Sequence, residues 1–415
     1  MPHKSWLLPL TICLLAVSAC DSRKPQSAET IDYAQEARRI ASTSIIVDTH
    51  IDVPMRVHAS GEDVSQATAE GDFDYPRAVA GGLNAPFMSI YTAADLEAEE
   101  RSREAADELI DIVEQMVADS PDKFAIARSP ADIRAHFEQG IVSLPMGMEN
   151  GSPIEGNLGS LKHFYDRGIR YITLAHSLSN HISDSSYDTR RRWDGLSDFG
   201  VEVVKEMNRF GIMVDVSHLS DDAFWDVLEI STAPVIASHS SARHFTPGWE
   251  RNISNEMIKA LAEQGGVVHV NFGSGFITEA ACEYDTKRFA AGREYMAANP
   301  DVTMGEMIRD WAPKYVAEHG PYPYATLEDV LDHIDHMVAL AGIDHVGIGS
   351  DYDGVGDTLP VGLKDVSTFP NLIEGLLRRG YSEEDIRKIL GENTLRVWAA
   401  VEAGAVRKQE TASAD

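Results

Sequence analysis

The chain has 415 residues, of which 43% are hydrophobic and 25% charged, so it has the composition of a globular protein with one large domain or two ordinary ones. Its 66 acidic and 36 basic side chains give a formal net charge of −30 at pH 7. This charge repels phosphate backbones and excludes nucleic acid as an expected partner.

The N-terminal segment has the features of an export signal. Lys4 precedes an apolar run from Trp6 to Val17 that is short for a bilayer span, and small residues lead up to Cys20. The pattern resembles a bacterial lipoprotein signal, which implies cleavage before Cys20, acylation of Cys20, and a cell-envelope location on the periplasmic side of the membrane. An ordinary secretory peptide is the alternative. We expect a signal peptide at 1–19, a polar tether at 20–40, a domain at 41–405 and a polar tail at 406–415, with membrane contact through the lipid anchor only.

Eight apolar runs follow the expected tether, separated by segments with helix signals such as Phe199–Phe210 and the stretch Glu383–Leu390 that Ser382 caps. Near-continuous apolar strands that alternate with helices predict a parallel sheet covered on its outer face, and eight such units predict a single closed (β/α)8 barrel of the TIM type. The expected strands are Ile45–His50, Pro86–Tyr91, Ile141–Glu149, Ile169–His176, Gly211–His218, Pro234–His239, Val267–Phe272 and His345–Asp351.

Histidines and carboxylates stand at or just past the carboxyl ends of six of these strands. In barrels of this type the carboxyl ends of the strands form the catalytic rim, so we expect these side chains to converge. One such residue alone is more often a hydrogen-bonded core or capping residue, but the set together favours a metal site. The set consists of His50, Asp52, Glu149, His176, His218, His239 and Asp351.

The types of ligand indicate the metal and its number. Three imidazoles and two carboxylates suit zinc or a similar borderline ion, and five protein ligands exceed what one catalytic zinc with an open position takes. We therefore expect two zinc ions per chain, with Glu149 as the bridge and a shared hydroxide that attacks a carbonyl carbon. The predicted reaction class is metal-assisted hydrolysis.

Six short motifs occur in order along most of the chain. They are Asp48–Pro54, Gly147–Gly151, Leu174–Ser177, Val214–His218, Ser238–Ser241 and Gly349–Gly354. From about Ile45 to Glu402 the chain resembles the renal (membrane) dipeptidase family of metallopeptidases. The resemblance implies a binuclear zinc barrel enzyme that cleaves dipeptides with free amino and carboxyl ends. It implies the metal ligands His50, Asp52, bridging Glu149, His218 and His239.

Roles for other residues follow from this resemblance and from the chemistry. We expect His176 to hydrogen-bond the scissile carbonyl oxygen, and Asp351 to carry the proton from the hydroxide to the leaving nitrogen, with Asp353 as the alternative acid. Arg251 lies in a segment that resembles the one whose arginine binds the substrate carboxylate, for which a bidentate guanidinium is suited. A surface ion pair with Glu250 or Glu256 is the alternative for Arg251.

Two regions depart from the family pattern. Pro86–Met88 replaces a Gln followed by aromatic residues, and Asn271–Phe276 lacks a tyrosine that would stand near the substrate carboxylate, which leaves specificity open. The connection Ile277–Tyr324 after the seventh strand is long for this fold and contains the helix-like stretches Asp285–Ala298 and Met304–Glu318. We expect this helical insertion to be either a lid or a contact in a homodimer.

The expected substrates are free dipeptides, L-Xaa-L-Xaa and also L-Xaa-D-Xaa, because the rim of a closed barrel is narrow and one carboxylate anchor need not fix the second side chain. Arg190–Arg192 after strand four either favours acidic first residues or is a solvated run of charge. Two alternative functions remain: an amidohydrolase, in which a carboxylated lysine would bridge the metals, and a non-catalytic lipoprotein that binds peptides.

Overall fold

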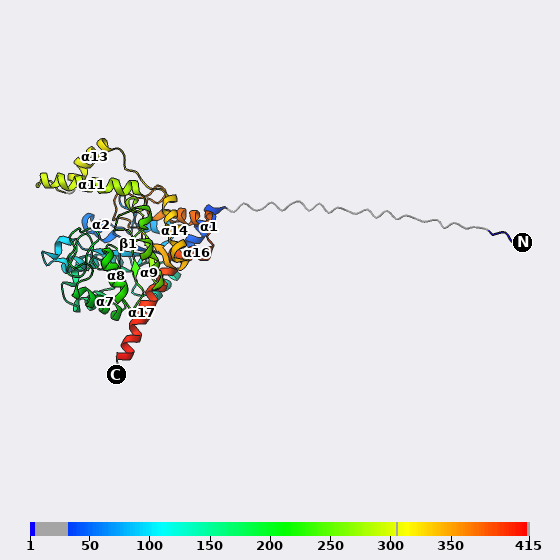
Figure 1. Ribbon diagram of the computed structural model, residues 1–415, viewed down its shortest axis with the longest axis horizontal. Helices are drawn as coiled ribbons and strands as arrows, with labels where there is room; N and C mark the ends of the chain where they lie inside the picture. Colours follow the sequence, from blue (N-terminus) through cyan, green and yellow to red (C-terminus); the bar gives the residue numbers. More distant parts are fainter. Residues whose placement is uncertain (5–31, 304–305, 413–415) are drawn as a thin grey trace. The chain divides into compact units, whose positions relative to one another are not determined.

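Eight parallel strands close into a barrel in which the order in space follows the order along the chain, and the last strand pairs back onto the first. In this computed structural model, which describes residues 1–4, 32–303 and 306–412, the barrel lies among the helices on the left of Figure 1, where β1 is labelled. Its strands are β1 (Ile46–Ile51), β2 (Leu83–Tyr91), β5 (Met146–Glu149), β6 (Ile169–Thr173), β7 (Met213–Asp215), β8 (Ile236–Ala237), β9 (Val267–Val270) and β10 (Val346–Ile348). The predicted (β/α)8 barrel is confirmed.

The barrel interior is filled at the end from which the strands start. Phe87 on β2 packs against Tyr171 on β6 and against Trp398, with ring centroids 5.4 Å from each. Trp398 belongs to α17 (Asn393–Ala412), which thereby closes that end with a fully buried indole. A larger apolar cluster lies between the strands and the surrounding helices. Because that end is packed, only the carboxyl ends of the strands are free to form a site.

Helices cover the barrel, and a serine or threonine begins several of them. Ser197, Ser220 and Ser254 each accept a hydrogen bond from the first turn of their helix. The helices are α1 (Tyr33–Thr43), α2 (Val53–Ser60), α3 (Tyr75–Gly81), α4 (Ser102–Asp119), α5 (Pro130–Gln139), α6 (Gly159–Arg167), α7 (Asp198–Phe210), α8 (Asp221–Ile230), α9 (Asn255–Glu263), α10 (Ser274–Ile277), α14 (Leu327–Ala341), α15 (Phe369–Arg378) and α16 (Glu383–Arg387). None of the helices in the described ranges combines the length and apolarity needed to cross a bilayer.

Both ends of the expected domain need correction. Residues 33–40, expected in the tether, belong to α1, whose Ala37, Ile40 and Ala41 are buried and which packs on α15. Residues 406–412, expected as a polar tail, continue α17. Ala37, Ile40 and Ala41 have the spacing of an apolar helix face. Burial of this face stabilises the helix despite the charged residues between them. Cys20 and nearly all of the expected signal peptide lie outside the described residues.

The third expected strand, Ile141–Glu149, is two strands. Pro145 separates β4 (Val142–Leu144), which pairs with β3 (Phe124–Ile126) in a small sheet of its own, from β5 in the barrel. Proline has no N–H to donate, although the Pro145 carbonyl still accepts a 2.8 Å bond from the Met88 amide. The fifth and sixth expected strands are also shorter than predicted, so that their histidines lie in the turns that follow β7 and β8.

The insertion after β9, the seventh barrel strand, is helical as predicted. It consists of α11 (Glu279–Ala298), a π-helical turn at Met307–Trp311 and α13 (Ala312–His319). α11 starts six residues before the expected helix because Thr278 caps it through a bond from the Ala281 amide. Figure 1 shows α11 and α13 at the top, beside the barrel rather than around it.

Candidate metal centre

The seven predicted site residues converge at the carboxyl ends of the strands. Within the described ranges, three groups of their ligand atoms lie close enough together to hold an ion, with all atoms of each group within 4.8 Å of one another. The groups are His50, Glu149 and His239; Glu149, His176 and His218; and His50, Asp52 and Asp351. Residues up to 301 positions apart in the chain therefore form one cluster on a rigid platform of strand ends.

Glu149, the last residue of β5, occupies the middle of the cluster. Its Oε1 atom lies 3.0 Å from His218 Nε2, 3.2 Å from His239 Nε2 and 3.4 Å from His176 Nε2. Its Oε2 atom lies 3.5 Å from His50 Nε2. One oxygen of the Glu149 carboxylate thus faces the imidazoles of His218, His239 and His176, and the other oxygen faces the imidazole of His50.

Asp52 and Asp351 complete the cluster on the His50 side. His50 Nε2 is 3.5 Å from Asp52 Oδ2 and 4.0 Å from Asp351 Oδ1. Gly354 makes this arrangement possible, since a Cβ atom there would come within 2.2 Å of Asp52 Oδ2 and 2.4 Å of Asp351 Oδ1. The loop after β10 can approach the two carboxylates only as bare backbone.

Hydrogen bonds behind the cluster orient two of the imidazoles. His50 Nδ1 lies 2.9 Å from the Tyr171 hydroxyl, which itself donates to a backbone carbonyl of β1. His239 Nδ1 lies 2.7 Å from the Ser238 hydroxyl, which donates to Asp215 Oδ2 at 2.6 Å. Each hydroxyl must therefore accept from Nδ1–H, and Nε2 of both rings points its lone pair into the cluster.

These donors fit a metal centre. Nε2 atoms of His218 and His239 lie 2.9 Å apart and, in the described part of the chain, the buried Nε2 of His50 has no hydrogen-bond partner. Burial lowers the pKa values of His218 and His239 well below the usual range, so both rings are neutral and able to bind a cation. Burial raises the pKa of Glu149, but the imidazoles of His176 and His50 outweigh it and hold this pKa well below normal.

Asp351 and Asp353 differ in what holds them. Asp351 accepts a 2.7 Å bond from Asn271 Nδ2, and burial raises the pKa of its carboxyl to about 7. Both oxygens of Asp353 are engaged elsewhere, one by Arg56 Nε at 3.1 Å and one by the Asp72 amide at 2.6 Å. The geometry therefore favours Asp351 over Asp353 as the group that carries a proton.

Arg251 is buried beside the cluster rather than paired on the surface. Its Nη1 donates to Ser240 Oγ at 2.8 Å and its Nη2 donates to the His239 carbonyl at 2.9 Å. The alternative ion pair with Glu250 or Glu256 does not form, and no carboxylate of the described residues lies within 4.0 Å of this guanidinium. A buried cation without an anion is costly, so Arg251 is suited to receive an anionic ligand.

The arginine run after β6 does not line the site. Arg191 bonds the carbonyls of Ser185 and Asp188 and pairs with Glu250, while Arg190 points into solvent with 86% of its side chain exposed. Its expected role in selecting acidic first residues has no support in this geometry. The run braces the loop after β6 instead.

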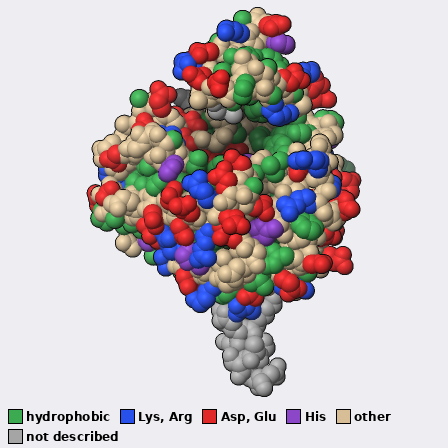
Figure 2. Space-filling view, turned by 90° about the vertical axis from the view of Figure 1, so that its left-hand side faces the viewer, with side chains coloured by type: hydrophobic (Ala, Val, Ile, Leu, Met, Phe, Trp, Pro, Cys, Tyr) green, Lys and Arg blue, Asp and Glu red, His purple; other side chains and the backbone are tan. Residues whose placement is uncertain are grey.

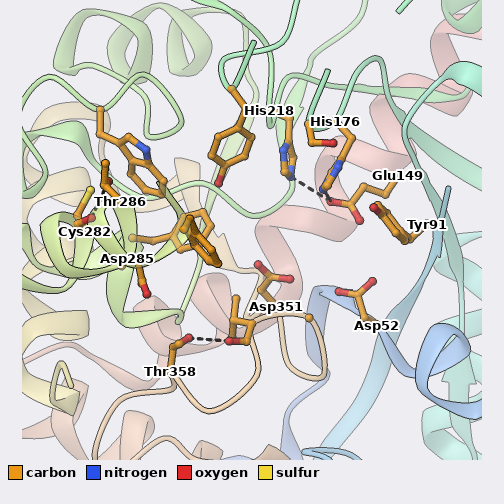
Figure 3. Close-up of a pocket in the computed structure, with 18 of the residues that line it drawn as sticks. Asp52, Tyr91, Glu149, His176, His218, Cys282, Asp285, Thr286, Asp351 and Thr358 are labelled. Carbon is orange, nitrogen blue, oxygen red and sulfur yellow. Dashed lines mark hydrogen bonds and ion pairs between the residues drawn. The ribbon is translucent and has the colours of Figure 1, made fainter. Parts of the chain in front are cut away.

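A cavity of about 1060 Å³ opens over the cluster, and Figure 2 shows the molecule hollowed below its upper lobe. The sequence predicts a narrow barrel rim, and a cavity of this volume is larger than that prediction implies. Figure 3 shows Glu149, His176, His218 and Tyr91 on one side and the α11 residues Cys282, Asp285 and Thr286 on the other. The aromatic side chains of Tyr187, Trp249 and Phe276 also line it.

Sequence reasoning missed these aromatic residues and the hydroxyls behind the ligands. Tyr171 lies inside an apolar run, and this pattern predicts a core residue. Nothing in the sequence distinguishes Tyr187 from a surface residue. Trp249, two positions from Arg251, carried a usable signal, as did the helical spacing of the α11 residues.

A parallel barrel with buried imidazoles and carboxylates at its rim defines a metal-dependent hydrolase. The chain belongs to the membrane dipeptidase family (peptidase family M19), whose family model matches residues 34–412. One similar solved structure is the probable dipeptidase PvdM from Pseudomonas aeruginosa, with 28% identity and a TM-score of 0.78 over 90% of this chain and 99% of that one. Another is a metallopeptidase from Rhodobacter sphaeroides bound to a phosphinate mimic of the dipeptide L-Ala-D-Ala, with 26% identity and a TM-score of 0.70 over 86% of this chain and 99% of that one.

The chain is thus a metallodipeptidase, and family membership decides against the non-catalytic peptide-binding alternative. The resemblance seen in the six sequence motifs is confirmed by a match that covers nearly the whole folded unit.

Proposed function

We propose that this metallodipeptidase uses two zinc ions to hydrolyse free dipeptides, of both the L-Xaa-L-Xaa and the L-Xaa-D-Xaa type, through a hydroxide that the ions share. The observation that carries this proposal is the position of Glu149. One of its oxygens faces His218 and His239, and the other faces His50. A carboxylate between two sets of ligands is the arrangement that a binuclear site requires.

His50, Asp52 and Glu149 would hold one ion, and Glu149, His218 and His239 the other. Imidazole and carboxylate ligands of this number suit zinc. When bound, such ions supply Lewis acidity, which brings the pKa of water towards neutrality and polarises a carbonyl group.

Two side chains of the cavity wall would act on the substrate directly. His176 is 19% exposed on the cavity side, and burial lowers its pKa, so it is neutral and can donate one N–H to the carbonyl oxygen as negative charge builds there. Asp351, whose pKa burial raises to about 7, would hold a proton and release it to the leaving nitrogen near neutral pH.

Charge sets the direction in which the substrate binds. The buried guanidinium of Arg251 would attract the free carboxylate, and the acidic side chains of Asp52 and Asp351 would face the free amino group. The wide cavity leaves room for either configuration of the second residue, and the mimic bound by the Rhodobacter sphaeroides relative contains a D-residue at that position.

We place the enzyme on the periplasmic side of a bacterial membrane, held by a lipid on Cys20. The folded unit begins at Tyr33, so residues 21–32 would separate it from the lipid, and twelve residues reach at most about 40 Å. A Cys20→Ala variant should then move from the membrane fraction to the soluble envelope fraction with its activity intact. Equal membrane retention of the variant would overturn the anchor.

The expected roles of the helical insertion are a lid and a contact in a homodimer. Because α11 lines the cavity, we propose that the insertion is a lid.

The central test combines metal analysis with a substrate panel. Chelator-treated protein should lose activity, and added zinc should restore it at two ions per chain. The restored enzyme should release amino acids from Ala-Ala and from L-Ala-D-Ala, but much more slowly from N-acetyl-Ala-Ala, from Ala-Ala amide and from Ala-Ala-Ala. Full activity without metal would contradict the zinc mechanism, and equal rates on the blocked peptides would contradict the dipeptide limit.

A further inference from the structure

The cavity wall opposite the metal centre is one face of α11. Five of its residues that line the cavity follow helical spacing, and Arg288 joins them from the edge of this face. They are Cys282, Asp285, Thr286, Phe289 and Arg293. Figure 3 shows Cys282, Asp285 and Thr286 across the cavity from Glu149 and His176. A substrate bound in the cavity would therefore lie between this wall and the metal centre.

The charge of this wall is positive, although the chain as a whole has a net charge of −30. Asp285 is neutralised in place, because Oδ1 accepts a 2.9 Å bond from Arg288 Nη2 and Oδ2 accepts a 2.7 Å bond from the Tyr322 hydroxyl. Arg288 Nε is buried and has no hydrogen-bond partner in the parts of the chain that the structure describes. Arg293 is exposed at the cavity edge and, over the same residues, has neither an ion pair nor a hydrogen bond.

The other acid near this wall does not cancel that charge. Asp353 also lines the cavity, but Arg56 Nε and the Asp72 amide already engage its two oxygens. Among the described residues of a chain with 66 acidic side chains, an arginine at a cavity edge without a carboxylate partner is a cation available to a ligand. An anionic group on the substrate would find its partner there.

The proposed function decides which part of a dipeptide meets this wall. The Arg251 guanidinium lies 5.0 Å from the Phe276 ring, and Phe276 belongs to α10, which directly precedes α11. Asp52, which would face the amino group, lies on the opposite side of the cavity in Figure 3. If Arg251 binds the substrate carboxylate, the C-terminal residue of a dipeptide would therefore lie on the side of the cavity where α10 leads into α11.

We propose, resting on the proposed function, that the α11 face is the subsite for the side chain of the C-terminal residue, and that Arg293, assisted by Arg288, selects an acidic side chain there. The ligand class is a dipeptide that ends in aspartate or glutamate. The hydrophobic parts of Phe289 and of the arginine stems would cover the methylene groups of that side chain.

The test compares Ala-Glu with Ala-Gln, which have nearly the same shape and differ in one charge. We expect the full-length zinc enzyme to prefer Ala-Glu in kcat/KM by roughly fivefold at low ionic strength, the upper range for an exposed ion pair, and to lose much of this preference at high salt. Arg293→Gln should bring the ratio close to one, Arg293→Lys should restore most of it, and Arg293→Glu should invert it. The pair Glu-Ala and Gln-Ala should show no comparable preference, because the first residue lies away from α11.

Lys287→Gln is the matched control. Lys287 lies on α11 with the same charge, but it pairs with Glu283 and does not line this cavity, so the ratio should stay at the wild-type value. A wild-type ratio near one, or a ratio that Arg293→Gln leaves unchanged, would overturn the subsite while the dipeptidase activity stands. Failure to cleave every dipeptide in the panel would overturn the proposed function and the subsite together.

Discussion

The metal centre and the α11 wall face each other across one cavity but are built in different ways. The seven side chains of the metal centre come from the ends of six barrel strands or the turns after them, and backbone and hydroxyl partners hold these side chains in place. The α11 wall comes from one helix of an insertion, in which Ala281 and Gly292 are the buried residues of those described. The barrel thus holds the side chains to which we assign the chemistry, whereas in the proposed subsite a weakly packed addition would determine which substrates they act on.

The largest effect is expected from removing the negative charge of Glu149 in the middle of the metal centre. Glu149→Gln keeps the shape but removes the carboxylate that both sets of imidazoles face. We expect zinc content to fall and kcat/KM to drop by more than about 10³-fold, beyond the loss caused by removing one transition-state hydrogen bond. Inductively coupled plasma analysis and dipeptide turnover measure the two effects. Glu138→Gln, on an exposed position of α5, is the control, and a Glu149→Gln enzyme with both zinc ions and normal turnover would refute the bridge.

Acidic pH should lower the free energy of unfolding of the barrel, which carries the first of the two regions compared. His269 on β9 is buried between the Ala237 carbonyl and the Thr394 hydroxyl, and burial lowers its pKa to about 4 from an ordinary value of about 6.5. Below pH 6.5 the unfolded chain takes up a proton that the folded chain binds only near pH 4. Stability is therefore complete above pH 6.5, and this one group lowers the free energy of unfolding by about 3 kcal/mol as the pH falls through that window.

Urea unfolding of the metal-free protein at a series of pH values measures this slope. His269→Gln should reduce the slope by one proton between pH 6.5 and 4, whereas His58→Gln, at an exposed position, should not. The same slope in the His269→Gln protein would show that other groups account for the acid sensitivity.

Arg251, the proposed anchor of the substrate carboxylate, contacts both the His239 carbonyl and the Phe276 ring, and its role can be tested separately from both regions. Arg251→Gln should lower kcat/KM for free dipeptides by about 10- to 100-fold, the value of charge-assisted hydrogen bonds, mainly by raising KM. The same variant should lose far less on Ala-Ala amide, which has no carboxylate to bind. Arg190→Gln, which removes an exposed arginine, is the control. A loss of equal size on both substrates would point to damage of the fold instead of the anchor.

The smallest expected effect concerns the hydroxyls behind the ligands. Tyr171→Phe removes the group that holds His50 Nδ1 and should weaken zinc binding by about tenfold, with nearly normal kcat once zinc is in excess. Competition with a chelator of known affinity measures the change. Tyr165→Phe, a half-buried tyrosine on α6, serves as the matched variant. Unchanged zinc affinity in Tyr171→Phe would mean that packing alone orients His50.

The sequence allowed the barrel and the metal-centre residues to be predicted because both depend on a local pattern. Six of the eight apolar runs end in or near a predicted ligand, and parallel strands of one barrel must bring those ends together. Pro145 marked the break in the third run, but the separate pairing of β3 with β4 is a tertiary contact that no local pattern reveals.

The features that were missed depend on contacts between distant segments. α1 was taken for tether because charged residues surround its few apolar ones, and only packing on α15 shows that Ile40 belongs to the core. The burial of Arg251 and the engagement of Asp353 by Arg56 and Asp72 likewise required coordinates, because ion pairing across the chain leaves no periodic signal.

The bare backbone at Gly354 carries a consequence for inherited variation in this chain. Alanine at this position would add one methyl group against two carboxylates of the candidate metal centre, without touching the packed end of the barrel. We therefore expect Gly354→Ala to give a full-length, folded protein with lowered activity. Surveys of sequence that score only the seven polar site residues would count such a protein as active.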